Sequence, residues 1–473
     1  MIPDVATTLG SDKMLQQTII TEGERRQALG MSTIAFTACF AVWTLFSIIG
    51  IRIQKELGLN NAEFGLLVGT PILTGAVSRL FIGILADRFG GRKVMALVML
   101  TGAAAAFLLS YAHSYAHLLA AALFMGVAGG SFAAGVAYVA RWYPKERTGT
   151  ALGIFGIGTF GAAITNFSSF LMVALGWVAI ARIWAAGLAA VAVAFYLFTK
   201  DDPLSRHRGM AANAASLAEQ LAPLAKLQVW RFAIYYAFVF GAFVALSLWL
   251  PRYYIGAYGL SVGMAGMLAT AFSLPGSVFR AVGGWLSDRF GARAVMYCTF
   301  GVSIGATFLL SYPSTHYIVQ GIKGPVEFTI AMRLVPFAML TFVLGMFMSF
   351  GMAAVYKHIP VYYPENVGSV GGLVGMIGGL GGFALPIAFG AMADLTGVWT
   401  SCFMLLFALV AGAMLWMHLA IRRMERRKVP ELSRLPELPE MEGLGPQAAS
   451  PPAAREAVQA ARPRFGDGLV PAK

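Results

Sequence analysis

Long runs of apolar residues, separated by short polar or glycine-rich stretches, dominate the chain. A helix needs about 20 residues to cross a bilayer core about 30 Å thick. Because a backbone in lipid must satisfy its own hydrogen bonds, such runs predict helices. We expect twelve transmembrane helices, near residues 30–51, 62–86, 94–111, 118–141, 149–172, 179–199, 231–251, 262–286, 295–311, 334–357, 368–390 and 398–420.

A polar segment divides these runs into two groups of six and predicts an all-α integral membrane fold of two pseudo-symmetric halves. The last part of the chain is rich in proline and alanine, a composition that buries too little apolar surface to fold. The expected organisation is a cytoplasmic N-terminal segment (1–29), a six-helix half (30–199), a cytoplasmic linker (200–230), a second six-helix half (231–421) and a disordered cytoplasmic tail (422–473).

Composition and charge agree with a membrane protein. Hydrophobic residues make up 58% of the chain and charged residues 12%, whereas about 25% of a soluble domain is charged. Most lysines and arginines fall in loops that the positive-inside rule would place, with both termini, in the cytoplasm. The net charge of +13 therefore reflects topology, and we expect no nucleic-acid partner. We expect a monomer in the lipid bilayer of a bacterial cytoplasmic membrane.

One motif occurs twice, once in each half. RLFIGILADRFGGR runs from Arg79 to Arg92, and RAVGGWLSDRFGAR runs from Arg280 to Arg293. In both copies an arginine lies within an apolar run, about 12 Å before an aspartate at the helical rise of 1.5 Å per residue. If the aspartates mark the water interface, Arg79 and Arg280 lie near the middle of the membrane.

These two arginines are the candidate binding residues. An intramembrane arginine can belong to a structural ion pair, but the central parts of the predicted spans contain no Asp or Glu. Carbonyls, hydroxyls, water or an anion from solution must then offset the cost of the charge. A guanidinium is planar and always charged, so it matches a planar oxyanion. Arg79 and Arg280 predict an anion site between the halves, where secondary transporters bind substrate.

The rest of the repeated motif is predicted to act on conformation. Its aspartates and basic residues lie at the expected cytoplasmic helix ends, where they can join neighbouring helices and lock one conformation. The alternative is a solvated loop. The residues are Asp87, Arg88, Arg92, Asp288, Arg289 and Arg293.

The GxLxDRFGxR motif in a chain of twelve spans resembles the major facilitator superfamily over residues 30–420. Two midplane arginines with glycine-rich fifth and eleventh spans are similar to the nitrate/nitrite porter family. FGAFVALSLWLPRYY (240–254) and YPENVGSVGGLVGMIGGLGGFALP (363–386) resemble its branch of proton-coupled nitrate importers. The resemblance implies a secondary transporter, not an enzyme, that moves nitrate and also nitrite by alternating access. It implies nitrate/proton symport and neither a cofactor nor a metal.

The resemblance also assigns site residues. Arg79 and Arg280 would hold a planar anion, with Phe132 and Tyr356 against its faces. Thr159 stands where the family's signature usually has an asparagine, although threonine can still donate one hydrogen bond. Glycine-rich segments around Thr159 and in the eleventh span would line the site and permit rocking, and their glycines are Gly156, Gly158, Gly161, Gly378, Gly379, Gly381 and Gly382.

The sequence is compatible with more than one coupling mode and more than one substrate. Symport normally uses a titratable group in the path, and the nearby candidates are Lys357 and His358, which can equally be a positive-inside anchor. Without a midspan carboxylate, nitrate/nitrite exchange is also compatible with the residues. Small carboxylates such as oxalate or formate fit arginine too, but the matched pair and glycine-rich walls favour an inorganic oxyanion. An anion sensor is the alternative of another class, and the proline-rich tail disfavours it.

Overall fold

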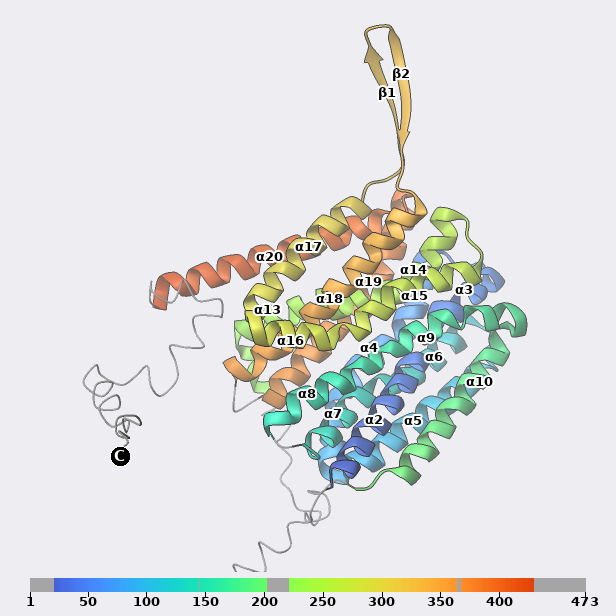
Figure 1. The fold of residues 1–473 in the computed structure, drawn as a ribbon. Helices are drawn as coiled ribbons and strands as arrows, with labels where there is room; N and C mark the ends of the chain where they lie inside the picture. Colours follow the sequence, from blue (N-terminus) through green and yellow to red (C-terminus); the bar gives the residue numbers. More distant parts are fainter. Residues whose placement is uncertain (1–20, 144, 202–220, 364–366, 429–473) are drawn as a thin grey trace, which may run out of the picture.

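In the computed structural model the chain forms two helical bundles (Figure 1), and the residues described are 21–143, 145–201, 221–363 and 367–428. The first bundle contains α-helices and two short 3-10 helices, η1 and η2. They are α2 (Glu22–Trp43), α3 (Phe46–Leu57), α4 (Asn61–Phe89), α5 (Gly91–Leu109), α6 (Tyr115–Gly126), η1 (Val127–Gly130), α7 (Ser131–Ala140), α8 (Lys145–Gly156), η2 (Ile157–Phe160), α9 (Gly161–Phe167) and α10 (Ser169–Phe198).

The second bundle begins with a 3-10 helix, η3, and contains one π-helical segment, η4. Its elements are η3 (Ala222–Ala225), α13 (Leu227–Tyr236), η4 (Ala237–Ala242), α14 (Phe243–Tyr258), α15 (Val262–Val278), α16 (Arg280–Phe290), α17 (Ala292–Leu310), β1 (Thr315–Gly321), β2 (Gly324–Ile330), α18 (Leu334–Tyr362), α19 (Val367–Thr396) and α20 (Ser401–Lys428).

The described residues contain 11 helical stretches long and apolar enough to cross a membrane. The count is 12 if α15 and α16, which meet at a bend of 42°, form one span. The expectation of an all-α, multi-pass membrane fold with twelve spans is therefore confirmed.

Two helices extend beyond the limits expected from hydropathy. α2 begins at Glu22 rather than near residue 30, because Thr21 and Glu24 form a capping box. The Glu24 N–H donates to Thr21 Oγ1 and the Thr21 N–H donates to the Glu24 carboxylate, both at 3.2 Å. α20 continues to Lys428, so the first residues of the expected tail are helical. Residues 1–20, 202–220 and 429–473, which carry the other parts of the expected terminal segment, linker and tail, lie outside the described residues.

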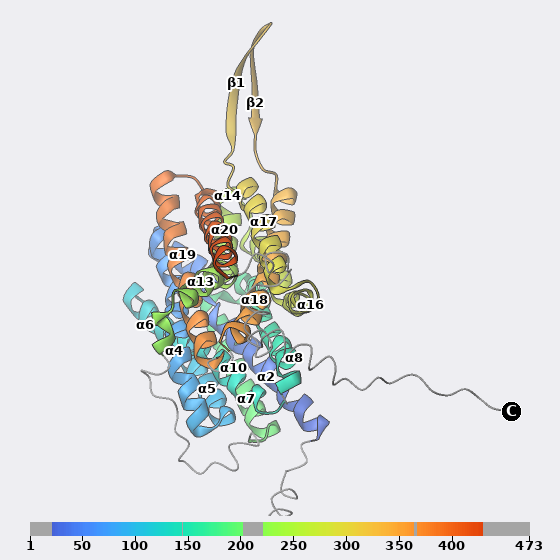
Figure 2. The same ribbon diagram turned by 90° about the vertical axis from the view of Figure 1, so that its left-hand side faces the viewer.

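A β-hairpin that hydropathy did not predict projects from the second bundle between α17 and α18 (Figures 1 and 2). β1 and β2 pair antiparallel, with Gly321 opposite Gly324. Gly324 has a φ of 122°, a conformation that glycine adopts without strain. We call the side of the molecule that carries this hairpin the hairpin end. The opposite side, with the α4–α5 and α16–α17 turns, is the basic end.

The two bundles meet closely at the hairpin end, where α4 and α19 run side by side (Figure 2). A Cβ on Gly65 of α4 would lie only 2.2 Å from the Pro386 carbonyl oxygen of α19. The Asp394 carboxylate accepts hydrogen bonds from Asn61 Nδ2 at 2.7 Å and from the Ala62 N–H at 2.9 Å. A residue of one bundle thus caps a helix of the other.

A second contact at this end joins α9 and α10 to the second bundle. The buried side chain of Asn166 accepts a hydrogen bond from Ser47 Oγ at 3.0 Å and donates to the Ser247 carbonyl at 3.3 Å. Ser169 Oγ donates to the Gly263 carbonyl at 3.2 Å. Backbone contact and buried hydrogen bonds therefore close the hairpin end.

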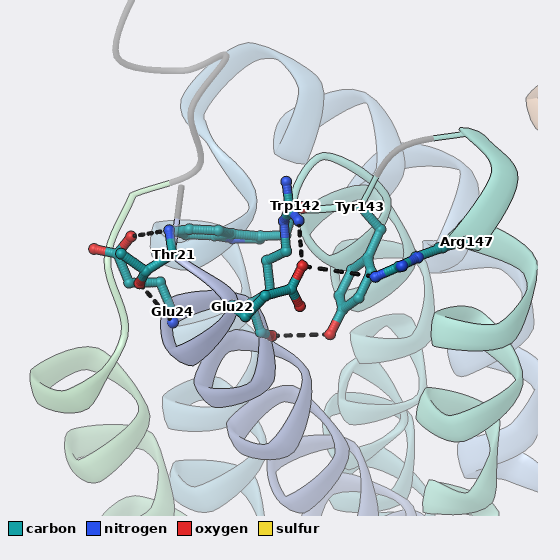
Figure 3. A network of polar contacts seen from close by, with 7 residues as sticks. Thr21, Glu22, Glu24, Trp142, Tyr143 and Arg147 are labelled. Carbon is teal, nitrogen blue, oxygen red and sulfur yellow. Dashed lines mark hydrogen bonds and ion pairs between the residues drawn. The ribbon is translucent and has the colours of Figure 1, made fainter. Parts of the chain in front are cut away.

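At the basic end, the start of α2 is tied to residues around the α7–α8 connection (Figure 3). Arg25 Nε donates to the Trp142 carbonyl at 3.1 Å, and Tyr143 Oη donates to the Arg25 carbonyl at 3.2 Å. Arg147 lies 3.6 Å from the Glu22 carboxylate. These contacts all lie within the first bundle, so they stabilise that bundle as a unit.

Replacing Gly65 with alanine should open the hairpin end, because the new methyl group would overlap the Pro386 backbone and force α4 and α19 apart. Spin labels on Leu57 and Leu395, exposed at this end, would report the separation in a Cys298→Ser background. We expect longer distances in Gly65→Ala than in the parent.

Gly412→Ala is the matched control, because a Cβ there would meet nothing within 4 Å. Unchanged distances in the Gly65→Ala protein would show that the α4–α19 contact does not hold the hairpin end closed.

Candidate anion-binding site

Several helices that surround the two arginines lose α-helical geometry beside them. η1 and η2 are 3-10 segments in the first bundle, and η4 is a π-helical segment in the second. α15 ends at a bend immediately before Arg280. Pro275 lies one turn before that bend, and proline removes a helical hydrogen bond. Interruptions of this kind within helices often mark functional sites.

Arg79 of α4 is buried, with 6% of its surface exposed. Its Nη1 donates to the Gly375 carbonyl of α19 at 3.1 Å, and its Nε donates to the Gly129 carbonyl of η1 at 3.4 Å. Backbone oxygens and aromatic faces offset part of the cost of this charge. Three ring centroids lie within 6 Å of its Cζ, those of Trp43 at 5.6 Å, Phe132 at 5.4 Å and Phe240 at 5.2 Å.

Arg280 of α16 is equally buried, at 7% exposure, but has fewer partners. Its Nη2 donates to Tyr236 Oη at 3.5 Å, and its Cζ lies 6.0 Å from the centroid of the Tyr356 ring. Its Nη1 is buried and makes no hydrogen bond to any of the residues that the structure describes. A buried charged donor without a partner requires an explanation, and a bound anion would supply one.

Two tyrosines of the second bundle join the surroundings of the arginines. The Tyr236 ring lies 5.1 Å from that of Tyr356 and stacks on Phe240 at 5.0 Å. A Cβ on Gly375 would lie 2.8 Å from Tyr356 Oη and 3.8 Å from Arg79 Nη1. The hydroxyl of Tyr356 and the guanidinium of Arg79 therefore lie on the same side of α19. The result is one compact cationic site with aromatic walls between the bundles.

Comparison with known proteins assigns the family. A model of the Major Facilitator Superfamily matches residues 31–315 and 253–460. The chain is 41% identical over 425 residues to the probable nitrate/nitrite antiporter NarK1 of Thermus thermophilus, across 86% of this chain and 94% of that protein. The chain belongs to the nitrate/nitrite porter family of the major facilitator superfamily. The resemblance expected from the sequence is confirmed, and the porter is a membrane transporter rather than an enzyme.

Further relatives and solved structures agree. The porter is 35% identical over 361 residues to the probable nitrate/nitrite transporter NarK2 of Mycobacterium tuberculosis, across 75% of this chain and 86% of that one. Its fold matches a bacterial homolog of the human lysosomal transporter Spinster, in an inward-facing and occupied conformation, with a TM-score of 0.64 and 17% identity. That match covers 85% of the porter and 98% of the other chain. The structural match shows the fold alone.

Two of the glycines assigned to the site adjoin an arginine. A Cβ on Gly156 would lie 3.3 Å from Cδ and Nε of Arg280, and a Cβ on Gly379 would lie 3.7 Å from Nη1 of Arg79. Thr159 is buried, and its hydroxyl donates to the Gly156 carbonyl at 3.2 Å. The hydroxyl is therefore used within its own helix in this conformation.

The other assigned glycines permit close approach between helices. The atom nearest to a Cβ on each belongs to a neighbouring helix rather than to an arginine. The pairs are Gly158 with Phe36, Gly161 with Thr37, Gly378 with Tyr236, Gly381 with Ala237, and Gly382 with Ile72. In this structure they shape the site indirectly, by bringing α2 and η4 close to it.

The residues of the repeated motif contact their own bundles. Arg92 forms an ion pair with Asp201 at 3.4 Å, and Asp288 forms one with Lys357. The remaining arginines lie against aromatic rings, Arg88 on Phe89, Arg289 on Trp285 and Phe290, and Arg293 on Tyr297. The side chain of Asp87 lies outside the described part of the structure. A lock between helices stays a prediction for these residues.

Lys357 and His358 lie on α18 but contact other groups than the arginine pair. Lys357 is the partner of Asp288. His358 is buried and stacks on Phe232, with ring centroids 5.8 Å apart. Neither position gives geometric support to a role in proton coupling at the site.

Sequence reasoning missed three residues that surround the arginines, namely Trp43, Tyr236 and Phe240. Aromatic residues are frequent in these spans, so no local pattern distinguishes the three that face the site. Which aromatic residues face the site depends on the register of α13 and η4 relative to α19, and only the folded structure gives that register.

We expect Gly158→Ala to lower the thermal stability of the purified porter even without an added anion. Its Cβ would lie 2.3 Å from the Phe36 ring, and overpacking of a core costs about 1–3 kcal/mol. Gly153→Ala is the control on the preceding helix, because a Cβ there meets nothing within 4 Å. A Gly158→Ala protein as stable as the parent would contradict the packing role.

Proposed function

We propose that the porter is a secondary transporter that exchanges nitrate for nitrite across the membrane by alternating access. The observation that carries the proposal is the unpartnered, buried Nη1 of Arg280, in a site that also holds Arg79. An oxyanion between the two guanidinium groups would accept hydrogen bonds from both. At an effective dielectric constant of 20, an anion about 4 Å from one such charge gains about 4 kcal/mol.

The walls of the site favour a small, flat anion. Phe132 and Phe240 face Arg79, and Tyr356 faces Arg280. Gly156 and Gly379 place no side chain beside the arginines. A flat ligand could therefore contact the aromatic rings with its faces and the two arginines with its edges. The names of the relatives specify nitrate and nitrite for those proteins, which supports the same substrates here over oxalate or formate.

Exchange is favoured over proton symport by the surroundings of the pair. Reorienting the bundles with an empty site would keep two guanidinium charges buried without a counter-charge, whereas a returning anion removes that cost. The proposed coupling candidates Lys357 and His358 are engaged elsewhere. The Thermus relative is named an antiporter. Nitrate/proton symport, favoured by the sequence resemblance, stays the competing mode.

The closed hairpin end supports access from the basic end in this conformation. Asp394 caps α4, and Asn166 bonds to the second bundle, so the hairpin end must open for the opposite state. We propose that the basic end faces the cytoplasm, with both termini there, and that the porter acts as a monomer in the cytoplasmic membrane.

Substituting lysine for both arginines, Arg79→Lys and Arg280→Lys together, should abolish nitrate uptake into proteoliposomes while the protein still folds. Lysine keeps the charge but offers no planar paired donors. We expect at least a tenfold loss for each single variant, equivalent to about 1.4 kcal/mol or more.

Arg52→Lys serves as the control, because Arg52 is exposed and pairs with Glu56. Full nitrate uptake by the double variant would refute the arginine site.

The coupling mode can be tested with proteoliposomes that have nitrate outside and either internal nitrite or an imposed pH gradient. We expect nitrate entry to require internal nitrite, with oxalate and formate failing to compete. Entry driven by the pH gradient with no internal anion would establish symport. Carboxylate flux without nitrate flux would keep the arginine site but replace the substrate.

A further inference from the structure

The second bundle holds a small cavity, partly open to the surface, at the basic end, and neither Arg79 nor Arg280 lines it. It lies among α13, α17, α18 and α20. Met417 and Ile421 of α20 form its apolar side. None of the described residues that line it is acidic, and its polar side consists of Gln228, Arg231, Tyr235, Arg293, His358 and Tyr362.

Nδ1 of His358 and Nε of Arg231 are buried nitrogen atoms of this lining that have no hydrogen-bond partner among the described residues. His358 is 4% exposed, and its ring is parallel to Phe232 within 3°. Arg231 donates through Nη2 to the side-chain Oε1 of Gln228 at 2.9 Å, so the arginine side chain is held in place. The Nε–H of Arg231 calls for an acceptor that the described residues do not provide, and a neutral imidazole can donate one further hydrogen bond.

We propose that this cavity binds a phosphate group, the phosphoryl group of an anionic phospholipid in preference to free phosphate. A tetrahedral oxyanion offers several acceptors in different directions, which suits Arg231 and His358 on two different helices. Basic pockets between transmembrane helices at the membrane surface are suited to lipid headgroups.

The cavity and the arginine site share two helices. On α13, Tyr235 lines the cavity and the next residue, Tyr236, contacts Arg280. On α18, His358 lines the cavity and Tyr356 faces Arg280. A phosphate group held by Arg231 and His358 would therefore fix α13 relative to α18, and with them the two tyrosines of the anion site.

The test uses the full-length protein in a nonionic detergent and follows thermal unfolding. The additions are phosphatidylglycerol, phosphatidylcholine, inorganic phosphate, and sodium chloride at matched ionic strength. We expect phosphatidylglycerol alone to raise the unfolding temperature by several degrees. The half-saturating lipid concentration should rise about tenfold in Arg231→Gln and in His358→Phe, because each removes an unpartnered nitrogen.

Arg423→Gln is the matched control, since Arg423 is an exposed basic residue of α20 that does not line the cavity. His358→Phe keeps an aromatic ring against Phe232, and Arg231→Lys keeps the charge without Nε. If one of the variants fails to fold, the others still test the site. If inorganic phosphate stabilises the parent and the same variants lose that effect, the cavity is a phosphate site but its ligand is free phosphate rather than a phospholipid. Equal responses in all variants, or no response of the parent to lipid or phosphate, would overturn the proposal.

Discussion

Two guanidinium groups within the apolar interior are the constraint on which the rest of the structure depends. Arginine in a hydrocarbon core is unfavourable unless polar or aromatic groups surround it. Arg79 obtains two backbone carbonyls and three aromatic rings. Gly375 and Gly379 of α19 both lie beside this charge, because a Cβ at either position would lie within 4 Å of Arg79 Nη1. The other glycines of that span, such as Gly378 and Gly382, instead permit close packing against neighbouring helices.

The groups that surround each arginine also join the bundles. Arg79 belongs to the first bundle but bonds to the Gly375 carbonyl and faces Phe240 of the second. Arg280 belongs to the second bundle and lies against Gly156 of the first. A rocking motion of one bundle must therefore exchange some of these partners. The proposed anion binding would be coupled to bundle orientation, because both use the same side chains.

The sequence predicted the parts of the site that depend on repetition and hydropathy. The repeated motif located Arg79 and Arg280, and the resemblance placed Phe132 and Tyr356, which the structure finds beside those arginines. The sequence could not predict the role of Tyr236, because nothing in an apolar span indicates which way an aromatic side chain points. The β-hairpin was missed because each strand has only 7 residues, whereas the hydropathy pattern was used to find spans of about 20 residues.

The pseudo-symmetry of the chain does not extend to the surroundings of the two arginines. They occupy equivalent places in the repeated motif, yet Arg79 bonds to two carbonyls whereas Arg280 bonds to one tyrosine hydroxyl and leaves Nη1 unpartnered. An anion bound as proposed would therefore complete the coordination of Arg280 more than that of Arg79. Its departure would leave the larger uncompensated charge on the second bundle, whose helices α15 and α16 already bend at Phe279. The bent helix that carries Arg280 is accordingly the element whose position should respond most directly to the presence of the anion.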